Sequence, residues 1–436
     1  MEFVTIDELV PQDHLLRKID KTIDFSFVHE LVKDLYCTDN GRPALDPTML
    51  FKLLFIGYLY GIRSERQLIR DVQVNVAYRW FLRLGLTDKV PDASTLSQNR
   101  RRRFNKSDVY QQIFDEIVCQ AIRKKLVSGK VLYTDSTHLK ANANKGKWIK
   151  ARAEASCRGY LSELDKAVEE DRLKHGKKPL PPRSNKAETR EVKRSTTDPD
   201  SGYMVRDGKP KGFFYLDHRT VDDRCNIVTD VHVTPGNVHD SVPYLDRLDR
   251  QRKRFGFEVN AVGLDAGYFT ASITKGLEER DIYGVISYRR PTHRKGYFYK
   301  REYHYETDTD TYRCPQGQRL IYATTDRNGY RHYQSNPKQC SQCPQRERCT
   351  RSVNATKTIT RHVWEDSKER TNSHRLSEGG RLIYSRRKET VERSFADAKQ
   401  LHGYRYARFR GQQKVAAQCL MTATAQNIKK IALLCA

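Results

Sequence analysis

Apolar residues recur at helical spacing through the first part of the chain, up to about residue 128. The pattern is found at Phe27-Leu31-Leu35, at Leu50-Leu53-Leu54 and at Val72-Val76-Trp80, with Gly57, Gly61 and Gly85 between the segments. Pro47 fits the first turn of a helix capped by Asp46. We therefore predict an all-helical domain over residues 1–128.

From residue 129 the pattern changes to short apolar strands. VLYTDSTHLKANA (131–143) begins as a buried strand and becomes polar at Asp135. The polar tract 140–211, with a helix predicted between Ile149 and His175, is interpreted as an insertion. Residues 213–223 and 226–240 then predict two strands of a hairpin that turns at Arg224 and Cys225.

Strands and helices alternate after this hairpin. A helix is predicted over 241–256, a strand that ends in Asp265 over 260–270, a helix over ITKGLEERDI and a strand over 283–290. This order predicts a mixed α/β sheet flanked by helices, which makes 129–293 the first part of a core domain.

Residues 294–375 break the pattern and carry four cysteines, Cys314, Cys340, Cys343 and Cys349. The Cys-x2-Cys pair and two further thiols are suitably spaced for a structural, tetrahedral Zn²⁺ site. His332 or His362 could replace one ligand. The alternative is a set of reduced cysteines in a small β-rich subdomain.

The last part of the chain, 376–436, returns to helical spacing. Glu392 lies near the middle of RRKETVERSFADAKQLHGYRYARF, with Lys388 one turn before it and Lys399 two turns after it, so the three can share one face. A further amphipathic helix follows to the C-terminus.

Charge indicates the class of partner. The chain has 436 residues, with 80 Lys and Arg against 54 Asp and Glu, a formal charge of +26, so nucleic acid is the first expectation. Charge alone does not separate a nuclease from a ribosome-associated protein or one bound to an acidic membrane surface. The N-terminus has no secretory pattern, and the apolar run 49–62 is short and contains Lys52. We therefore expect an intracellular protein without a membrane span.

A basic helix is predicted after Pro91, in DASTLSQNRRRRFNK, with Ser94 or Thr95 as its cap. Its candidate DNA contacts are Arg100, Arg101 and Arg103, in a run that also includes Arg102 and Lys106. The alternative is a solvated basic helix.

Three carboxylates are the candidate catalytic residues: Asp135 and Asp265 at strand ends, and Glu392 on the late helix. Such a set suits phosphoryl transfer with two divalent cations roughly 3.5–4 Å apart, because the cations offset the repulsion and stabilise the attacking and leaving oxygens. Oxygen ligands favour Mg²⁺. Lys388, Lys399 and Arg405 would then contact the phosphate backbone.

The chain resembles the DDE transposases of bacterial insertion sequences, which have an RNase H-like core. The resemblance rests on TDSTHLKANA, TPGNVHD, GLDAGYF and KETVERSFADAK-x2-HGYRYAR, and on RPALDPTMLFKLLFIGYLYGIRSERQL in the N-terminal domain. It implies two Mg²⁺ or Mn²⁺ ions, cleavage at terminal inverted repeats, joining of the 3′-hydroxyl ends to target DNA, and a homodimer on DNA in the bacterial cytoplasm, at the nucleoid.

The resemblance assigns the acidic triad to Asp135, Asp265 and Glu392, and a basic role to Lys399. Many relatives have Arg four residues before the glutamate and Tyr three residues before that Arg. Here Lys388 and Ser385 hold these positions, and Tyr384 and Arg387 stand next to them. Glu389 is a rival for the third carboxylate but lacks the spacing to Lys399. Turn, cap or solvent-exposed roles, and not catalysis, are expected for His138, Asn237, His239 and Asp240.

Two other functions remain open from the sequence. A DNA-binding regulator or inactive relic would keep the fold without needing three acids. An RNase H-like nuclease would need neither the basic helical domain nor the cysteine-bearing insertion.

Overall fold

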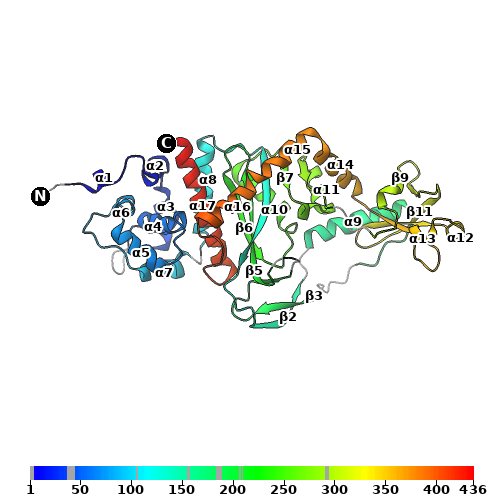
Figure 1. Cartoon of the computed structure of the whole chain (residues 1–436), viewed down its shortest axis with the longest axis horizontal. Coiled ribbons are helices and arrows are strands. Elements are labelled where there is room, and N and C mark those ends of the chain that lie inside the picture. The colour runs from blue at the N-terminus through cyan, green and yellow to red at the C-terminus, as the bar shows by residue number, and fades with distance from the viewer. Residues whose placement is uncertain are drawn as a thin grey trace. The chain divides into compact units, whose positions relative to one another are not determined.

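The computed structural model describes residues 4–36, 45–104, 107–154, 158–182, 189–205, 208, 210–289 and 294–436. The chain forms two compact units (Figure 1). The first unit comprises Met1–Arg152, Glu191–Gly267 and Glu378–Ala436, and the second comprises Ala153–Arg190 and Tyr268–Ser377.

The first unit begins with a helical bundle. Its elements are α1 (Ile6–Leu9), α2 (Leu15–Thr22), α3 (Phe27–Val32), η1 (Lys33–Leu35), α4 (Pro47–Leu59), α5 (Glu65–Val74), α6 (Val76–Phe81), α7 (Ala93–Arg102) and α8 (Val109–Arg123). Asp46 accepts a hydrogen bond from the Thr48 amide at 2.9 Å, with Pro47 in the first turn, as the sequence predicts. Helix α4 is buried, and its Lys52 reaches Asp20 at 2.8 Å. This ion pair explains how a lysine is tolerated in the apolar run.

The sheet of the first unit is built on β1 (Val131–Lys140). Strand β5 (Gly212–Asp222) pairs with it antiparallel, and β7 (Ala261–Leu264) pairs with it parallel. Strand β6 (Val228–Pro235) forms the predicted hairpin with β5. The other strands on the β5 side are β2 (Trp148–Glu154), β3 (Thr189–Ser195) and β4 (Gly202–Met204). The combination of parallel and antiparallel pairs confirms the predicted mixed α/β sheet.

Helices of the first unit cover this sheet: α10 (Tyr244–Phe255), α15 (Glu378–Ser385), η5 (Arg386–Lys388), α16 (Val391–Leu401) and α17 (Gln412–Cys435). Helix α17 packs on β6 and also on α2, α4 and α8, so it joins the sheet to the N-terminal bundle (Figure 1). Within this interface Arg219 is fully buried, pairs with Asp217 at 2.7 Å and donates to Gln426 at 2.7 Å. Since breaking a buried pair leaves an uncompensated charge, this network fixes β5 against α17.

The second unit contains α9 (Arg158–Lys174), η3 (Ala266–Tyr268) at its edge, α11 (Ala271–Glu279), β8 (Tyr283–Ile286), η4 (Lys300–Glu302), α12 (Pro337–Ser341), α13 (Arg346–Cys349) and α14 (Glu365–Leu376). Its own antiparallel sheet has the order β13-β12-β11-β10-β9. The strands are β9 (His304–Glu306), β10 (Thr311–Arg313), β11 (Arg319–Thr325), β12 (Tyr330–Ser335) and β13 (Thr358–His362). Tyr303, Tyr312, Leu320, Tyr333 and Ile359 form its core.

The helix predicted between Ile149 and His175 is present as α9, Arg158–Lys174. The residues before it, Trp148–Glu154, form strand β2, which the sequence does not predict. Residues 148–154 form a strand because they pair with β3, although a helix is expected from their local sequence. None of the described helices is long and apolar enough to cross a membrane.

Candidate active site

Parallel pairing of β1 with β7 places Asp135 and Asp265 side by side. Asp265 follows the carboxyl end of β7, whereas β1 continues past Asp135 to Lys140, so the prediction that Asp135 ends its strand is wrong. Thr134 of β1 pairs with Leu264 of β7, and each aspartate is the next residue of its chain segment. Neighbouring strands lie about 4.8 Å apart, so both carboxylates meet at one edge of the sheet. Each is also held locally: the Ser136 amide donates to Asp135 Oδ1 at 2.8 Å, and the Gly267 amide donates to Asp265 Oδ1 at 2.9 Å.

Asp240 is a third carboxylate at this edge. Its Oδ1 accepts a hydrogen bond from Ser136 Oγ at 2.7 Å. A β-carbon on Gly267 would stand 3.1 Å from Asp265 Oδ1 and 3.7 Å from Asp240 Oδ2, so the glycine leaves room for the two acids on either side of it. The sequence suggested only turn or cap chemistry for Asp240, because the contact with Ser136 spans 104 residues and leaves no local signal.

The charges around Asp135 and Asp265 favour the binding of a cation. The pKa of Asp135 is raised to about 6, chiefly by burial; the guanidinium of Arg387 lowers it, and the charges of Asp265 and Asp240 add smaller increases. Arg387 Nη2 lies 2.8 Å from Asp135 Oδ2, and its guanidinium lies 5.5 Å from the ring of Tyr384. The tyrosine and arginine that stand beside the expected signature positions thus meet next to Asp135.

Glu392 lies on a helix that runs along β1. Just before α16, Arg387 binds Asp135, and at the far end of the helix Lys399 Nζ donates to Thr137 Oγ1 at 2.7 Å. Glu392, in the first turn, falls between these two anchors and its side chain is exposed. Among the described residues, however, no group of three or more His, Cys, Asp or Glu side chains is arranged to hold a metal ion. The structure therefore joins Asp135 and Asp265 but leaves Glu392 outside their immediate cluster.

These residues fit a hard divalent cation. The donors of Asp135 and Asp265 are carboxylate oxygens, which Mg²⁺ and Mn²⁺ prefer. The pKa of Asp135 is raised mainly by burial, with smaller contributions from Asp265 and Asp240, despite the bond to Arg387. A cation bound by Asp135 and Asp265 would supply the missing charge.

A proton should compete with metal at Asp135. Because its pKa is raised to about 6, the carboxyl is mostly ionised above that pH and mostly protonated below it. Since metal ligands bind deprotonated, the affinity for Mn²⁺ should be nearly constant above pH 7 and fall about tenfold per pH unit below 6. Titration calorimetry between pH 5 and pH 8 checks this, and an affinity unchanged down to pH 5 contradicts it.

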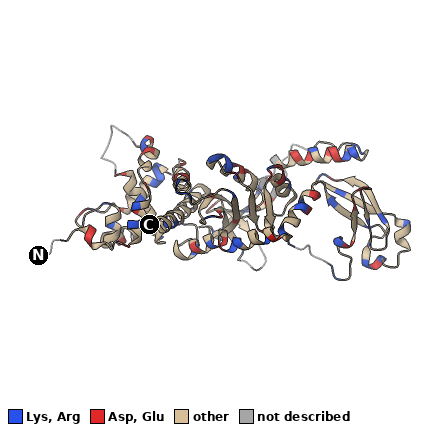
Figure 2. Cartoon of the chain, turned by 90° about the horizontal axis from the view of Figure 1, so that it is seen from above, with Lys and Arg blue, Asp and Glu red and all other residues tan. Residues whose placement is uncertain are grey.

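The candidate DNA contacts divide into exposed and internally bound residues. Arg101, Lys388 and Arg405 are exposed. Arg100 pairs with Glu65, and Arg103 lies 4.2 Å over the Tyr36 ring and bonds Asn99, so both are engaged within the fold. Lys106 lies outside the described residues. Lys and Arg occur on elements throughout the described chain, mixed with fewer Asp and Glu, so charge alone does not locate the DNA surface (Figure 2).

The predicted cap of the basic helix is wrong. Helix α7 begins at Ala93 after Asp92, so Ser94 and Thr95 lie in its first turn instead of capping it. The Thr95 amide already bonds the backbone oxygen of Asp92 at 2.9 Å, which starts the helix earlier than expected.

The four cysteines of the second unit line one small cavity of about 30 Å³. Burial raises the pKa of the Cys349 thiol, and the Tyr303 hydroxyl lies 3.2 Å from its sulfur. His332 pairs with Asp326 at 2.9 Å, and His362 accepts from the Trp364 amide at 3.1 Å; neither lines the cavity. The thiols are gathered, but the described side chains show no three-ligand metal group there. The zinc site stays a prediction.

Two family models match separate parts of the chain. Residues 4–102 match a model described as a transposase domain (DUF772), and residues 313–432 match a model described as a transposase DDE domain. The second match includes Glu392 and Lys399, whereas Asp135 and Asp265 lie before it. None of the curated proteins compared with the chain matches it.

Two solved structures have partial similarity to the chain. One is the Mos1 transposase paired-end complex with left transposon end, at 13% identity and a TM-score of 0.18, covering 57% of this chain and 61% of that one. The other is the Mos1 mariner paired-end complex with Mn, at 14% identity and a TM-score of 0.17, covering 58% and 62%. The chain thus spans about three-fifths of the length of these relatives.

Proposed function

Because the chain belongs to the DDE transposases, we propose that it binds the terminal inverted repeats of a bacterial insertion sequence, cleaves DNA at the element ends and joins the 3′-hydroxyl ends to target DNA. The parallel register that places Asp135 beside Asp265 carries this proposal. Phosphodiester hydrolysis needs acids that hold cations near positive charge, and the proximity of Asp135, Asp265, Arg387 and Lys399 supports this proposal.

The catalytic roles follow from the contacts. Asp135, Asp265 and Glu392 would hold two Mg²⁺ or Mn²⁺ ions, which stabilise the charge on the attacking and leaving oxygens when bound. Arg387 fixes the orientation of the Asp135 carboxylate through its bond at 2.8 Å. Lys399, held by Thr137 at 2.7 Å, presents a cation near the strand ends where a phosphate would lie. Exposed Lys388 and Arg405 add phosphate contacts.

We further propose a division of labour along the chain. Residues 1–128 would bind DNA with the exposed part of the basic helix, residues 129–293 and 376–436 would form the catalytic core, and residues 294–375 would form the cysteine-bearing insertion. Two copies of the chain would act together, since two element ends must be joined. The protein would work in the cytoplasm, on the nucleoid.

Cleavage by the purified chain tests this function. A duplex that carries the inverted repeats flanking the gene should be cut in Mg²⁺ or Mn²⁺, and EDTA should abolish cutting because the clustered acids cannot act without cations. Denaturing electrophoresis of end-labelled DNA gives the readout. A chain that binds the repeats but cuts them in neither metal would instead be a DNA-binding regulator or an inactive relative.

The zinc site is a separate proposal for the second unit. If Cys314, Cys340, Cys343 and Cys349 bind Zn²⁺, metal analysis should find about one zinc per chain, and Cys343→Ser should release it and lower the melting temperature. The exposed Cys435, which lies in the first unit, offers a matched control as Cys435→Ser. A content below about half a zinc per chain contradicts the site.

A further inference from the structure

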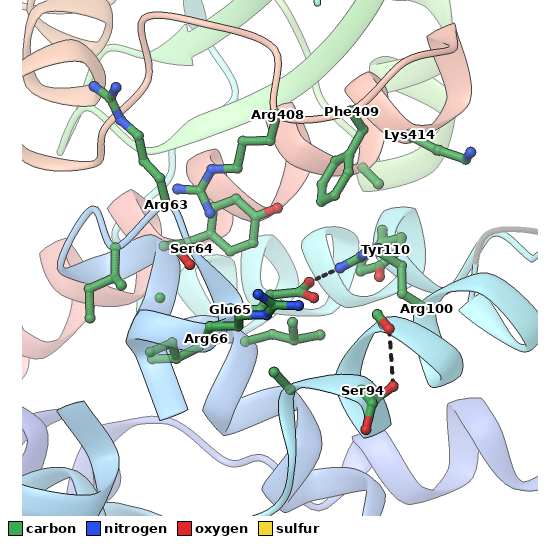
Figure 3. Close-up of a pocket in the computed structure, with 18 residues that line it drawn as sticks. Arg63, Ser64, Glu65, Arg66, Ser94, Arg100, Tyr110, Arg408, Phe409 and Lys414 are labelled. Carbon is green, nitrogen blue, oxygen red and sulfur yellow. Dashed lines mark hydrogen bonds and ion pairs between the residues drawn. The ribbon is translucent and has the colours of Figure 1, made fainter. Parts of the chain in front are cut away.

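A cavity of about 570 Å³ opens in the first unit between the beginnings of α5 and α7 and the segment that joins α16 to α17 (Figure 3). We call it the arginine cavity. Its basic lining residues are Arg63, Arg66, Arg100, Arg408 and Lys414. Glu65 is the one carboxylate among the residues that line it.

The charges of this cavity are not balanced from within. Glu65 is already paired with Arg100, as Figure 3 shows. The other four cations of the lining form no ion pair with any described residue. Three of them, Arg63, Arg66 and Lys414, are exposed, and Arg408 is half-buried. Four cations without counter-charges therefore face one concave site, which favours an anionic ligand.

Arg408 is the strongest indication of a ligand. Its guanidinium lies 4.5 Å over the Tyr58 ring, and its buried Nε has no hydrogen-bond partner among the described residues. Burial lowers the pKa of Arg408, and the nearby charge of Arg63 lowers it as well. An unmet buried N–H costs free energy, and an oxyanion would satisfy it. Arginine is well suited to this because its planar fork matches a phosphate.

Aromatic side chains and helix ends shape the cavity for that ligand. Phe409 supports the guanidinium of Arg100 at 4.4 Å, as Tyr58 supports that of Arg408, so both cations are held in place. The first turns of α5, α7 and α17 all contribute lining residues. Their amide groups add partial positive charge to the side-chain cations.

A row of contacts leads from the active site to the cavity. Past the contact of Thr137 with Lys399, the backbone oxygen of Lys140 accepts a hydrogen bond from the Ala407 amide at 2.9 Å. Lys140 is the last residue of β1, and Ala407 directly precedes Arg408. That last residue, Lys140, lies 5.7 Å over the Tyr406 ring, and Arg63 of the cavity lies 5.8 Å over the same ring. Asp135 is five residues before Lys140 in the strand, which corresponds to roughly 17 Å.

We propose that the arginine cavity binds a backbone phosphate of the DNA strand that extends from the active site along the end of β1. This inference rests on the proposed function, because it takes the ligand to be the DNA whose cleavage occurs at Asp135 and Asp265. The contact is made to phosphate, so it holds DNA in register irrespective of base sequence.

Salt-dependent DNA binding tests the cavity separately from cleavage. The probe is a fluorescein-labelled duplex of mixed sequence, titrated with the full chain in EDTA at several salt concentrations. The double variant Arg63→Gln/Lys414→Gln and the single variant Arg408→Gln remove cavity cations. Each lost phosphate contact should weaken binding about tenfold at moderate salt and reduce the slope of log K against log salt by about 0.9.

Arg70→Gln is the matched control, because Arg70 is exposed on α5 one turn beyond Arg66 and does not line the cavity. It should leave both affinity and slope within error. Arg63 and Lys414 are exposed, so their double variant should keep the melting temperature and report on binding even if Arg408→Gln unfolds. A slope equal to that of the unaltered chain in the folded double variant overturns the proposal.

The same data separate the two proposals. If the double variant binds DNA like the unaltered chain while the latter still cuts inverted-repeat DNA in Mg²⁺, the cavity is not a phosphate site and the proposed function stands. If the slope falls as expected but no metal supports cutting, the cavity binds DNA in a protein without the proposed activity, and the inferred link to an active-site strand is overturned.

Discussion

Asp265→Asn should abolish metal-dependent DNA cleavage while DNA affinity stays within about twofold. The change keeps the size of the side chain, and the amide oxygen can still accept the hydrogen bond that the Gly267 amide gives to Oδ1 at 2.9 Å. What is lost is one negative charge directly after the pair Thr134 and Leu264, beside Asp135. Loss of a shared metal ligand should reduce the cleavage rate on the order of a thousandfold, equivalent to ~4 kcal/mol.

A second measurement distinguishes the loss of a ligand from damage to the fold. The charge of Asp265 helps to raise the pKa of Asp135, so Asp265→Asn should lower that pKa from about 6 toward its ordinary range. Carboxyl NMR titration without metal reports this shift. Asp246→Asn, at an exposed position on α10, is the control and should change neither the pKa nor the cleavage rate. Normal cleavage by Asp265→Asn would remove Asp265 from the active site.

The sequence predicts the two apolar runs that lead to Asp135 and Asp265 because burial of each run follows from its hydrophobicity. It places the end of β7 correctly before Asp265 but ends β1 too early, because pairing with β5 extends β1 from Asp135 to Lys140. The hairpin of β5 and β6 is predictable for the same reason, since the turn lies between two apolar segments. The β2 strand is missed because it depends on pairing with β3, which follows more than thirty residues later.

Partners from distant segments explain most of what the sequence does not reveal. Arg387 contacts Asp135 across 252 residues, and Ser136 contacts Asp240 across 104 residues, so neither contact has a local pattern. For the arginine run of α7, by contrast, the sequence suggests more exposed DNA contacts than the structure has. It suggests one DNA-facing surface, but Arg100 is paired with Glu65 and Arg103 is held by Asn99, which leaves Arg101 and Arg102 exposed. The arginine cavity likewise joins segments that are far apart in the sequence.

The third carboxylate can be assigned by comparing Glu392→Gln with Glu389→Gln. Both side chains are exposed, so neither change should unfold the protein. Lys399 is anchored to Thr137 beside Asp135, and Glu392 lies two turns before Lys399 on the same face of α16. Glu389 precedes the helix and is displaced around its axis. Glu392 thus has the seven-residue spacing to Lys399 that Glu389 lacks.

Glu392→Gln should therefore reduce the rate of cleavage on the order of a thousandfold, while Glu389→Gln should stay within about threefold of the unaltered chain. Single-turnover cleavage in Mg²⁺, with DNA affinity measured in parallel, separates lost chemistry from lost binding. Mn²⁺ should rescue Glu392→Gln in part, because Mn²⁺ binds more tightly than lighter divalent ions to a weakened ligand set. The opposite ranking of the two variants would transfer the role to Glu389 and would mean that α16 shifts when metal and DNA bind.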